Sequence, residues 1–470
     1  MAILKILSDE DIERIHQATL RILAETGVAL DHPSTQELLR SAGALEERGR
    51  VKLMPELVET CLAKCPPTFC LRGRDGSTKT MGDGALHFHN LGGARDLFDP
   101  VSGSKRYATI KDLQDATRLL DALENCHTVT PFFTPCDVPG ELMSLMMYRH
   151  ALPHTTKPLQ GPGVQYPAEV QYALRLAEVI GPPREVLSLA VSPVSPLTIP
   201  AHEAEAILEI ARAGIAFGPL PCPTAGATAP LSMAGALAQQ NAEVLASLVL
   251  AQVAHPGLPM IYCGRLAMME PRTGISVWGG IELALVSAAT VQLGHFYHLP
   301  VNVYGFSTNS HVLDIQDGFE RGINAAIPAM AGADELSGIG EMEAGVSGSF
   351  AQMVADDEFA GGVLRLQRGF EVNEHALAVE VIARVMNGTR NFLGQKHTMQ
   401  FLKSGEVRMT RLAERGSWET WESGGRQGLA DRAQAEAERL LREHQVEPLG
   451  DSQIKELDAI MASAEKDLVQ

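Results

Sequence analysis

The sequence predicts an α/β protein built on a (β/α)8 TIM-like barrel, with an N-terminal α/β extension and a helical C-terminal tail. Two observations predict the barrel. From residue 109 onward, helical patterns alternate with short apolar runs, and near-continuous apolar strands are typical of a parallel sheet buried on both faces. The alternation continues over roughly 250 residues, which fits a closed barrel better than an open doubly wound sheet. The predicted domains are residues 1–108, 109–400 and 401–470.

The composition is that of a large folded protein with an acidic surface. The chain has 470 residues, 45% of them hydrophobic, and a formal net charge of -18. An acidic surface argues against nucleic acid and against anionic membranes as partners. No run approaches the ~18 consecutive apolar residues of a membrane helix, and the first residues lack the apolar core of a signal peptide. We therefore expect a cytoplasmic protein.

The N-terminal extension is expected to be a small mixed α/β region. Its predicted helices cover residues 8–26, 34–42 and 55–64, and its predicted strands cover residues 68–72 and 85–90. Ser8 suits the N-cap of the first helix, because its hydroxyl can accept a hydrogen bond from the first helical turn. Gly27 suits the end of the same helix.

Seven pairs of a helix and a strand make up the predicted barrel. The helices are expected over residues 110–123, 142–152, 168–180, 202–213, 233–254, 281–298 and 315–331. Each helix is followed by an apolar strand, over residues 129–133, 157–160, 186–191, 215–220, 259–263, 301–304 and 335–339. The sequence shows no clear eighth strand. In such a barrel the loops after the strands share one mouth, where the chemistry takes place.

The segment at residues 300–319 is the strongest candidate for a functional loop. Its apolar strand ends at Gly305, and a polar loop follows before Asp314 opens a helical pattern. The chain contains no G-x-S-x-G, no H-E-x-x-H, no P-loop and no dinucleotide-binding glycine motif after a strand. Glu341 and Glu343 could form a carboxylate pair, but paired carboxylates are otherwise scarce near the predicted mouth, so a hydrolase that uses two carboxylates is not expected. We therefore expect no catalytic residue beyond those that position the substrate.

Aromatic residues make up only 5% of the chain, yet several fall near the predicted mouth. An aromatic wall suits a quaternary ammonium ion, which is held by ring faces because it has no N–H to donate. Packing in the core is the alternative for each ring, and Trp278, in a glycine-flanked loop, is the least core-like. The rings are Phe88, Phe132, Phe133, Tyr262, Trp278, Tyr304, Phe306 and Phe350.

Two histidines leave a metal-dependent alternative open. His87 and His89 share one face of a predicted strand and could together ligate a metal ion. A pair without a third ligand is a weak metal site, and histidines hydrogen-bonded in a polar cleft explain the spacing better. We therefore predict no bound metal.

Five segments carry a resemblance to a known family. They are LGGARDLFDPVSGSKRYATIKDL at residues 91–113, HTTKP at 154–158, SHVLDIQDGFE at 310–320, GSFAQMVADDEF at 348–359 and NFLGQKHT at 391–398. In this order, over nearly the whole chain, they resemble the trimethylamine methyltransferase family. The resemblance implies a TIM-barrel methyltransferase that passes a methyl group from a methylated amine to the cobalt of a separate corrinoid protein.

The resemblance also bears on the substrate. The trimethylamine-using branch carries pyrrolysine in its barrel, whereas residues 306–312 here are ordinary amino acids. The chain therefore resembles the larger branch without pyrrolysine, whose characterised members demethylate quaternary amines such as glycine betaine, proline betaine or carnitine. Transfer of a methyl group from a quaternary ammonium to Co(I) expels a neutral tertiary amine, so no protein acid is needed. The protein's task would be positioning.

The expected substrate-binding residues follow from these arguments. Aromatic faces would hold the cation, and a cationic or hydrogen-bond-donating residue would fix a carboxylate, with arginine the best geometric match. The candidates for the carboxylate are His89, Arg95, Lys157, Arg265 and His311. The family match adds Asp356 as a carboxylate of the site itself. The candidates for the cation include Phe88, Trp278, Tyr304, Phe306 and Phe350.

The corrinoid is expected on a partner protein. The chain contains no D-x-H-x-x-G segment, the lower-ligand motif of corrinoid-binding domains, so this chain is not expected to bind cobalamin tightly by itself. A non-catalytic barrel that binds or senses betaine remains an alternative function.

The C-terminal part is predicted to be helical. A helix that starts after Ser349 runs through Arg368, another covers residues 370–386, and a charged helix covers residues 430–443. The tail is expected to pack on a sister subunit in a homo-oligomer.

Overall fold

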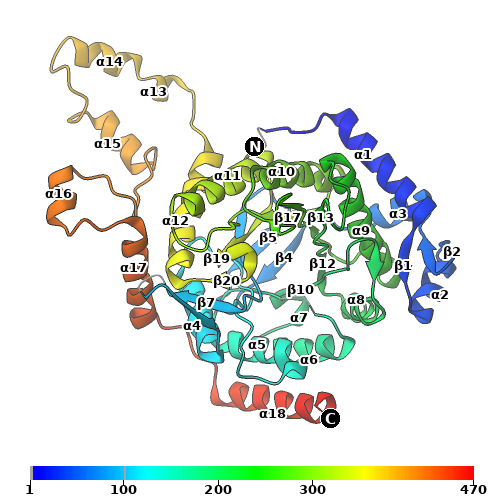
Figure 1. The fold of residues 1–470 in the computed structure, drawn as a ribbon. Coiled ribbons are helices and arrows are strands. Elements are labelled where there is room, and N and C mark those ends of the chain that lie inside the picture. The colour runs from blue at the N-terminus through cyan, green and yellow to red at the C-terminus, as the bar shows by residue number, and fades with distance from the viewer. Residues whose placement is uncertain (1–3, 100–101, 162–163, 470) are drawn as a thin grey trace.

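The structure is a computed structural model that describes residues 4–99, 102–161 and 164–469, and Figure 1 shows helices arranged around a central group of strands. Helix α1 (Asp9–Arg21) runs into a π-helical turn, η1 (Ile22–Thr26). The predicted N-cap is confirmed, since Oγ of Ser8 accepts a hydrogen bond from the N–H of Asp11 at 3.1 Å. Gly27 ends the segment with φ of 68°, which glycine adopts without strain.

The rest of the N-terminal region forms short helices and small sheets. The helices are α2 (Pro33–Ser41) and α3 (Pro55–Leu62). The strands are β1 (Val28–Leu30), β2 (Leu45–Glu47), β3 (Arg50–Lys52), β4 (Phe69–Arg72) and β5 (Thr78–Met81), and β1 also pairs with β11 (Thr198–Ile199).

The parallel sheet at the centre consists of short, buried strands. Its strands are β6 (His87–Asn90), β9 (Leu159–Gln160), β10 (Leu187–Val191), β12 (Ala216–Pro219), β14 (Tyr262–Gly264), β17 (Val301–Tyr304) and β18 (Glu335–Ile339). They form two parallel sheets, ordered β9–β10–β12 and β14–β17–β18–β6. The strands predicted at these positions are confirmed.

Single parallel bridges link the two sheets to each other. Phe217 at β12 pairs with Met260 just before β14, which joins the sheets on one side. On the other side, Val129 pairs with Leu159 of β9 while Thr128 pairs with His89 of β6. Followed strand by strand, the parallel pairings return to the strand from which they start. The strand predicted over residues 129–133 is reduced to these bridges.

Strand β6 pairs within this sheet although it precedes residue 109. Leu336 of β18 lies opposite Phe88 in parallel register. The sequence places β6 in the N-terminal extension, because the residues His-Phe-His-Asn lack the apolar run that marks the other strands. The central sheet therefore takes strands from both sides of that boundary.

The hairpin of β4 and β5 covers the amino-terminal ends of three central strands. Nε2 of His87, the first residue of β6, lies 3.2 Å from the carbonyl oxygen of Thr80. Arg72 forms an ion pair at 3.4 Å with Glu185 of the turn that leads into β10. The N–H of Arg74 donates to the carbonyl of residue 156, just before β9, at 2.6 Å. The hairpin therefore lies at the base of the sheet, behind the central strands in Figure 1.

Helices surround the sheet, as Figure 1 shows. They are α4 (Ile110–Ala122), α5 (Met143–Ala151), α6 (Pro167–Glu178), α8 (Ala201–Ala213), α9 (Met233–Ala254), α10 (Ile281–Phe296) and α11 (Ile315–Ala331). Their ends agree with the predicted ranges to within two residues. Short helices η2 (Gly140–Leu142), η3 (Leu152–His154) and α7 (Pro183–Val186) lie between them.

The loops at the carboxyl ends of the strands contain small sheets of their own. One sheet joins β7 (Asp96–Asp99), β8 (Ser104–Tyr107), β19 (Glu341–Met342) and β20 (Ser347–Gly348), with the turn η4 (Glu343–Gly345) beside it. The other joins β13 (Thr224–Ala225), β15 (Ala267–Met269) and β16 (Ser276–Val277). These loops are thereby held in place above the central strands.

The C-terminal part differs from its prediction in one helix. Instead of one helix over residues 370–386, the structure has α13 (Glu374–Leu377) and α14 (Val379–Met386), because Ala378 between them takes a left-handed conformation with φ of 54°. The predicted helix that ends at Arg368 and the predicted charged helix are confirmed. The helices of this part also include α12 (Phe350–Arg368), α15 (Lys396–Lys403), α16 (Trp418–Ser423), α17 (Leu429–Glu443) and α18 (Asp451–Leu468).

Helices α13 to α15 project away from the rest of the molecule (Figure 1). Helix α18 instead runs along α6, at the opposite end of the C-terminal part. None of the helices within the described ranges combines the length and apolar character needed to cross a membrane.

Candidate functional site

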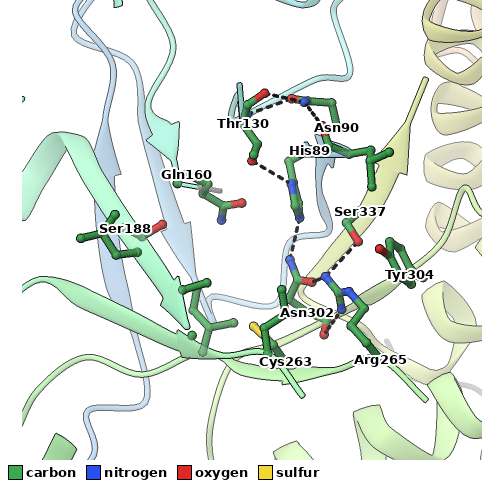
Figure 2. Close-up of a pocket in the computed structure, with 18 residues that line it drawn as sticks. His89, Asn90, Thr130, Gln160, Ser188, Cys263, Arg265, Asn302, Tyr304 and Ser337 are labelled. Carbon is green, nitrogen blue, oxygen red and sulfur yellow. Dashed lines mark hydrogen bonds between the residues drawn. The ribbon is translucent and has the colours of Figure 1, made fainter. Parts of the chain in front are cut away.

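A pocket of ≈ 140 Å³ lies inside the ring of parallel strands, at their carboxyl-terminal ends (Figure 2). Its walls are backbone and small side chains on one side and polar side chains on the other. It is lined by His89, Asn90, Leu91, Gly92, Thr130, Gln160, Gly161, Ser188, Leu189, Ala190, Gly218, Leu220, Ile261, Cys263, Arg265, Asn302, Tyr304 and Ser337. Pockets at this end of parallel strands are where such folds bind ligands.

His89 of β6 is a neutral imidazole in this pocket. Burial lowers its pKa below the ordinary value, and the nearby Arg265 cation lowers it further, although the neighbouring carboxylate of Glu335 opposes both. Its Nε2 lies 2.9 Å from the amide nitrogen of Asn302, which can only donate, so Nε2 is the accepting nitrogen. Nδ1 lies 3.5 Å from Oγ1 of Thr130. The ring is thus fixed as the tautomer protonated at Nδ1.

Glu335, the first residue of β18, places a fully buried carboxylate beside the pocket. Nε2 of Gln160 donates to both of its oxygens at 2.9 Å, and Oγ1 of Thr128 donates to Oε1 at 3.2 Å. The amide of Asn302 donates to Oε2. Gln160, Thr128 and Asn302 are uncharged donors, and the nearby His89 is neutral. The carboxylate is well hydrogen-bonded, and its charge is balanced by no cation within ion-pair distance among the described residues.

Arg265 is the corresponding cation, and only 4% of the residue is exposed. Its Nη1 donates to the carbonyls of Gly264 at 3.1 Å and Asn302 at 3.0 Å. Its Nη2 donates to Oδ1 of Asn302 and, at 3.0 Å, to Oγ of Ser337. All these acceptors are neutral oxygens. A buried guanidinium without a carboxylate partner in the described part of the chain leaves a positive charge available to an anionic ligand.

Asn302 of β17 connects the two charges. Its Oδ1 accepts from Arg265 while its Nδ2 donates to Glu335, as Figure 2 shows in part. One amide therefore stands between the guanidinium and the carboxylate and prevents their direct contact. The positive group consequently lies on the pocket wall, while the negative group lies buried behind Gln160 and Asn302, which do line the pocket.

Tyr304 lines the pocket, but one face of its ring is already occupied. The guanidinium carbon of Arg265 lies 4.4 Å from the ring centroid, a cation–π distance. Trp278 packs on the same ring at 5.2 Å in an edge-on arrangement and is not among the residues that line the pocket. Tyr304 thus packs on Arg265, and Trp278 in turn packs on Tyr304.

Three other aromatic candidates lie away from the pocket. Phe88 and Phe306 are fully buried, and their ring centroids lie 5.7 Å apart in the core. Phe350 is partly buried against Phe133, with ring centroids 6.3 Å apart. The residue after Phe88 on β6 does reach the pocket, because successive side chains of a strand point to opposite faces.

The remaining carboxylate candidates also lie elsewhere. The side chain of Arg95 is 60% exposed and pairs with Asp96 at 2.8 Å, and that of His311 is 75% exposed and lies 3.2 Å from Glu343. Lys157 is directed to the carboxyl end of α4, where its Nζ donates to two backbone carbonyls at 2.6 and 2.8 Å. Of the cationic and donor candidates, the pocket lining includes His89 and Arg265.

Asp356 belongs to a second buried charge cluster, above β18. Its Oδ2 accepts from Nη1 of Arg321 at 3.0 Å and from the N–H of Gly340 at 2.7 Å. Arg321, fully buried, also pairs with Asp317 at 2.6 Å and donates to the backbone carbonyl of Glu341. These bonds tie α11 and α12 to the end of β18, so the cluster stabilises the loops above the pocket.

Glu341, close to that cluster, has an incompletely bonded carboxyl. Burial raises its pKa to about 7, although a hydrogen bond from Oγ of Ser307 at 2.6 Å and the charge of Arg321 act in the opposite direction. Its Oε2 is buried without a hydrogen-bond partner. Burial therefore favours the protonated form of this group over a wider pH range than in an exposed glutamate.

The histidine pair does not come together with further ligands. His87 contacts the β4–β5 hairpin, while His89 contacts Asn302 and Thr130. Within the part of the chain that the structure describes, no group of three or more His, Cys, Asp or Glu side chains is placed to hold a metal ion.

Sequence reasoning did not single out Gln160, Asn302 or Glu335. Each is a polar residue inside or at the end of an apolar strand, where a buried polar side chain needs partners. A polar residue within an apolar strand can be seen in the sequence, but the sequence does not show which buried polar residues face one another.

Comparison with known proteins gives the following matches. The family model described as trimethylamine methyltransferase (MTTB) matches residues 1–468. The trimethylamine methyltransferase MttB of Desulfitobacterium hafniense is 29% identical over 468 residues, 97% of this chain and 93% of the relative. MttB of Methanosarcina barkeri is 30% identical over 479 residues, 98% and 96% of the two chains. A glycine betaine methyltransferase of D. hafniense is 30% identical over 425 residues, 88% of each.

A solved structure supports the fold. The monomethylamine methyltransferase MtmB of M. barkeri superposes with a TM-score of 0.54 at 13% identity, covering 98% of this chain and 88% of that one. At 13% identity, this likeness supports the fold alone, which is a mixed arrangement of helices and strands.

Proposed function

The chain belongs to the trimethylamine methyltransferase family, and from this membership we propose that it demethylates a quaternary amine that also bears a carboxylate, of the glycine betaine type. The methyl acceptor is proposed to be the cobalt of a corrinoid carried by a separate protein, and therefore a second substrate. A cytoplasmic location and a homo-oligomeric state are part of the same proposal.

The fold supports this proposal if the central sheet is a (β/α)8 barrel. The parallel pairings of β6, the Thr128–Val129 segment, β9, β10, β12, β14, β17 and β18 follow one another in a cycle, with helices outside. We propose that they close a barrel whose axis passes through the pocket. The mouth of the barrel is then where substrate and acceptor meet.

The observation that carries the substrate assignment is the buried Arg265 on the pocket wall. Its hydrogen bonds go to neutral oxygens, so its charge is left for a ligand. Glu335 supplies a negative charge at a separate place, with the amide of Asn302 in between. A zwitterion also carries a positive and a negative charge at different places, and the carboxylate would bind near Arg265 and the ammonium on the side of Glu335.

This arrangement suits methyl transfer from a quaternary ammonium. Co(I) supplies the electron pair of the new bond between cobalt and the methyl carbon. The bond between nitrogen and the methyl carbon breaks at the same time, and its electron pair stays on the nitrogen, which leaves as a neutral amine. A strong ion pair to the ammonium would favour the reactant over this neutral product. The hydrogen bonds from Gln160, Asn302 and Thr128 spread the charge of Glu335 and so limit that effect.

The test is a substrate panel with the purified protein. Co(I) cobalamin or a reduced corrinoid protein is incubated with glycine betaine, proline betaine, carnitine, trimethylamine or choline, and methylcobalamin formation is followed by absorbance. We expect activity with the carboxylate-bearing amines and little with choline, which lacks a carboxylate. Equal activity with choline, or none with any amine, contradicts the proposal. Calorimetric binding of a betaine without methyl transfer supports the non-catalytic binding barrel instead.

A further inference from the structure

One part of the pocket wall is built from neighbouring strands whose inward-facing side chains are small. Ser188 of β10, Gly218 of β12 and Cys263 of β14 all line the pocket. Phe217, the residue before Gly218, is fully buried in the core and lies outside the lining, because successive side chains of a strand face opposite ways. We call Ser188, Gly218 and Cys263 the pocket arc.

The pocket arc lies between the two amides that bind Glu335. In parallel register, Ser188 lies opposite Gln160 of β9, and Cys263 lies opposite Asn302 of β17. Gln160 and Asn302 also line the pocket, and both donate to the buried carboxylate of Glu335. Figure 2 shows these four lining residues around the same part of the pocket. A ligand group that lies beside the two amides therefore has the pocket arc as its other neighbour.

The space along the pocket arc is limited by one close approach. A Cβ atom added to Gly218 would lie 3.0 Å from Sγ of Cys263, which is closer than an ordinary contact. Burial raises the pKa of the Cys263 thiol to about 12, so this side chain carries no charge. The whole pocket has ≈ 140 Å³, less than the roughly 300 Å³ at the lower end of ordinary ligand pockets. The addition or removal of a single heavy atom on the arc therefore changes a substantial part of the available space.

We propose that the pocket arc determines the size of the ammonium head group that the pocket admits, with three N-methyl groups as the upper limit. The inference rests on the proposed function, which places the ammonium on the side of Glu335. A quaternary head group has no N–H to donate, so discrimination between head groups depends on the fit of their carbon atoms against the wall. Gly218 and Cys263 are thus specificity-determining residues.

The test is isothermal titration calorimetry with three ligands that share one carboxylate end and differ only at the nitrogen. They are dimethylglycine, glycine betaine and the triethyl analogue of glycine betaine. We expect the wild type to bind glycine betaine about tenfold or more tightly than the triethyl analogue, whose extra carbon atoms do not fit. Cys263→Ala removes the sulfur atom and should reduce this preference about fivefold or more.

Gly218→Ala should have the opposite effect on the space. Gly218 lies in a strand, so alanine fits its backbone, but the new methyl group narrows the pocket. The Kd for glycine betaine should rise about tenfold, and the Kd for dimethylglycine, which has one methyl group fewer, should rise less.

The double variant Gly218→Ala/Cys263→Ala distinguishes fit from a general loss of structure. It removes the sulfur atom that the new methyl group would meet, so the Kd for glycine betaine should return to within about threefold of the wild-type value. If each substitution acted only by damaging the fold, the two effects would add, and the double variant would bind more weakly than either single variant.

Two substitutions outside the pocket lining serve as matched controls. Cys126→Ala removes the sulfur atom of another buried cysteine, and Gly318→Ala adds a methyl group on α11 where no atom lies within 4 Å. Both controls should keep the wild-type ratios of the three Kd values, and the Tm of each variant shows that it is folded.

Two failures can be told apart. If the wild type binds glycine betaine but shows no preference over the triethyl analogue, or if the arc variants keep the wild-type ratios of Kd values, this inference alone is overturned. If the wild type binds none of the three ligands, the proposed function is overturned, and the inference is overturned with it.

Discussion

Replacement of Arg265 by methionine is expected to weaken binding of a betaine and to abolish the preference over choline. The substitution keeps a long side chain but removes the guanidinium. A charge-assisted hydrogen bond to a carboxylate contributes about 1.5–3 kcal/mol. At about 1.4 kcal/mol per factor of ten, the Kd for glycine betaine should rise about 10- to 150-fold, while the Kd for choline should change little.

The same variant should also lose some stability. The carbonyls of Gly264 and Asn302, Oδ1 of Asn302 and Oγ of Ser337 lose their donor, and an unsatisfied buried acceptor costs about 1–3 kcal/mol. Water in the adjacent pocket can replace part of these bonds, and removal of a buried cation recovers its desolvation cost. We therefore expect the free energy of unfolding to fall by only about 1–3 kcal/mol, so that the variant stays folded and binding can be measured.

The assay is isothermal titration calorimetry with glycine betaine and with choline, at a temperature well below the Tm of the variant. Arg95→Met is the matched control, because the side chain of Arg95 is 60% exposed and lies outside the pocket lining. It should bind both ligands like the wild type. A folded Arg265→Met protein whose Kd for glycine betaine lies within twofold of the wild-type value refutes the assignment of the carboxylate to Arg265.

Two further predictions concern buried carboxylates. Glu335→Gln should reduce the preference for glycine betaine over 3,3-dimethylbutanoate, an analogue in which a neutral carbon replaces the ammonium nitrogen. The reduction should be about tenfold or more, because the negative charge near the ammonium is lost. An unchanged ratio of the two Kd values in calorimetry contradicts this placement of the cation. Glu341→Gln should remove a pH dependence of stability. Burial raises the folded pKa of Glu341 to about 7, above its value of 4.5 in the unfolded chain, so the folded state holds the extra proton between pH 4.5 and 7 and wild-type stability falls as pH rises through that window. Urea unfolding at pH 5 and pH 8 should show a smaller difference in the free energy of unfolding for Glu341→Gln than for the wild type. Equal differences in the two proteins would contradict this prediction.

The fold could be read from the sequence where apolar runs are continuous. The run at Val301–Tyr304 and the helix at Met233–Ala254 appear at the predicted positions, because burial on both faces leaves a clear pattern. β6 was not recognised as a member of the central sheet, since two of its four residues are histidines. The break in the predicted helix over residues 370–386 depends on the left-handed conformation of Ala378, which alanine rarely adopts.

The candidate site could be predicted only in part. Arg265 was singled out because arginine matches a carboxylate, and it lines the pocket. Glu335 and Asn302 were not, since their partners come from other strands and the pairing appears only when the sheet is assembled. Phe88 and Phe306 face the core, because the faces of short strands cannot be assigned until the register is known.

The β4–β5 hairpin has a consequence for the order of events during turnover. Since it covers the base of the central strands, ligands reach the pocket from the mouth. Under the proposed reaction, the amine enters through the same opening at which the partner protein that carries the acceptor docks. The amine must then bind first, because the docked partner closes this opening. The demethylated product leaves after the partner has dissociated. Steady-state kinetics would accordingly be compulsory-order, with excess partner protein inhibiting by blocking entry.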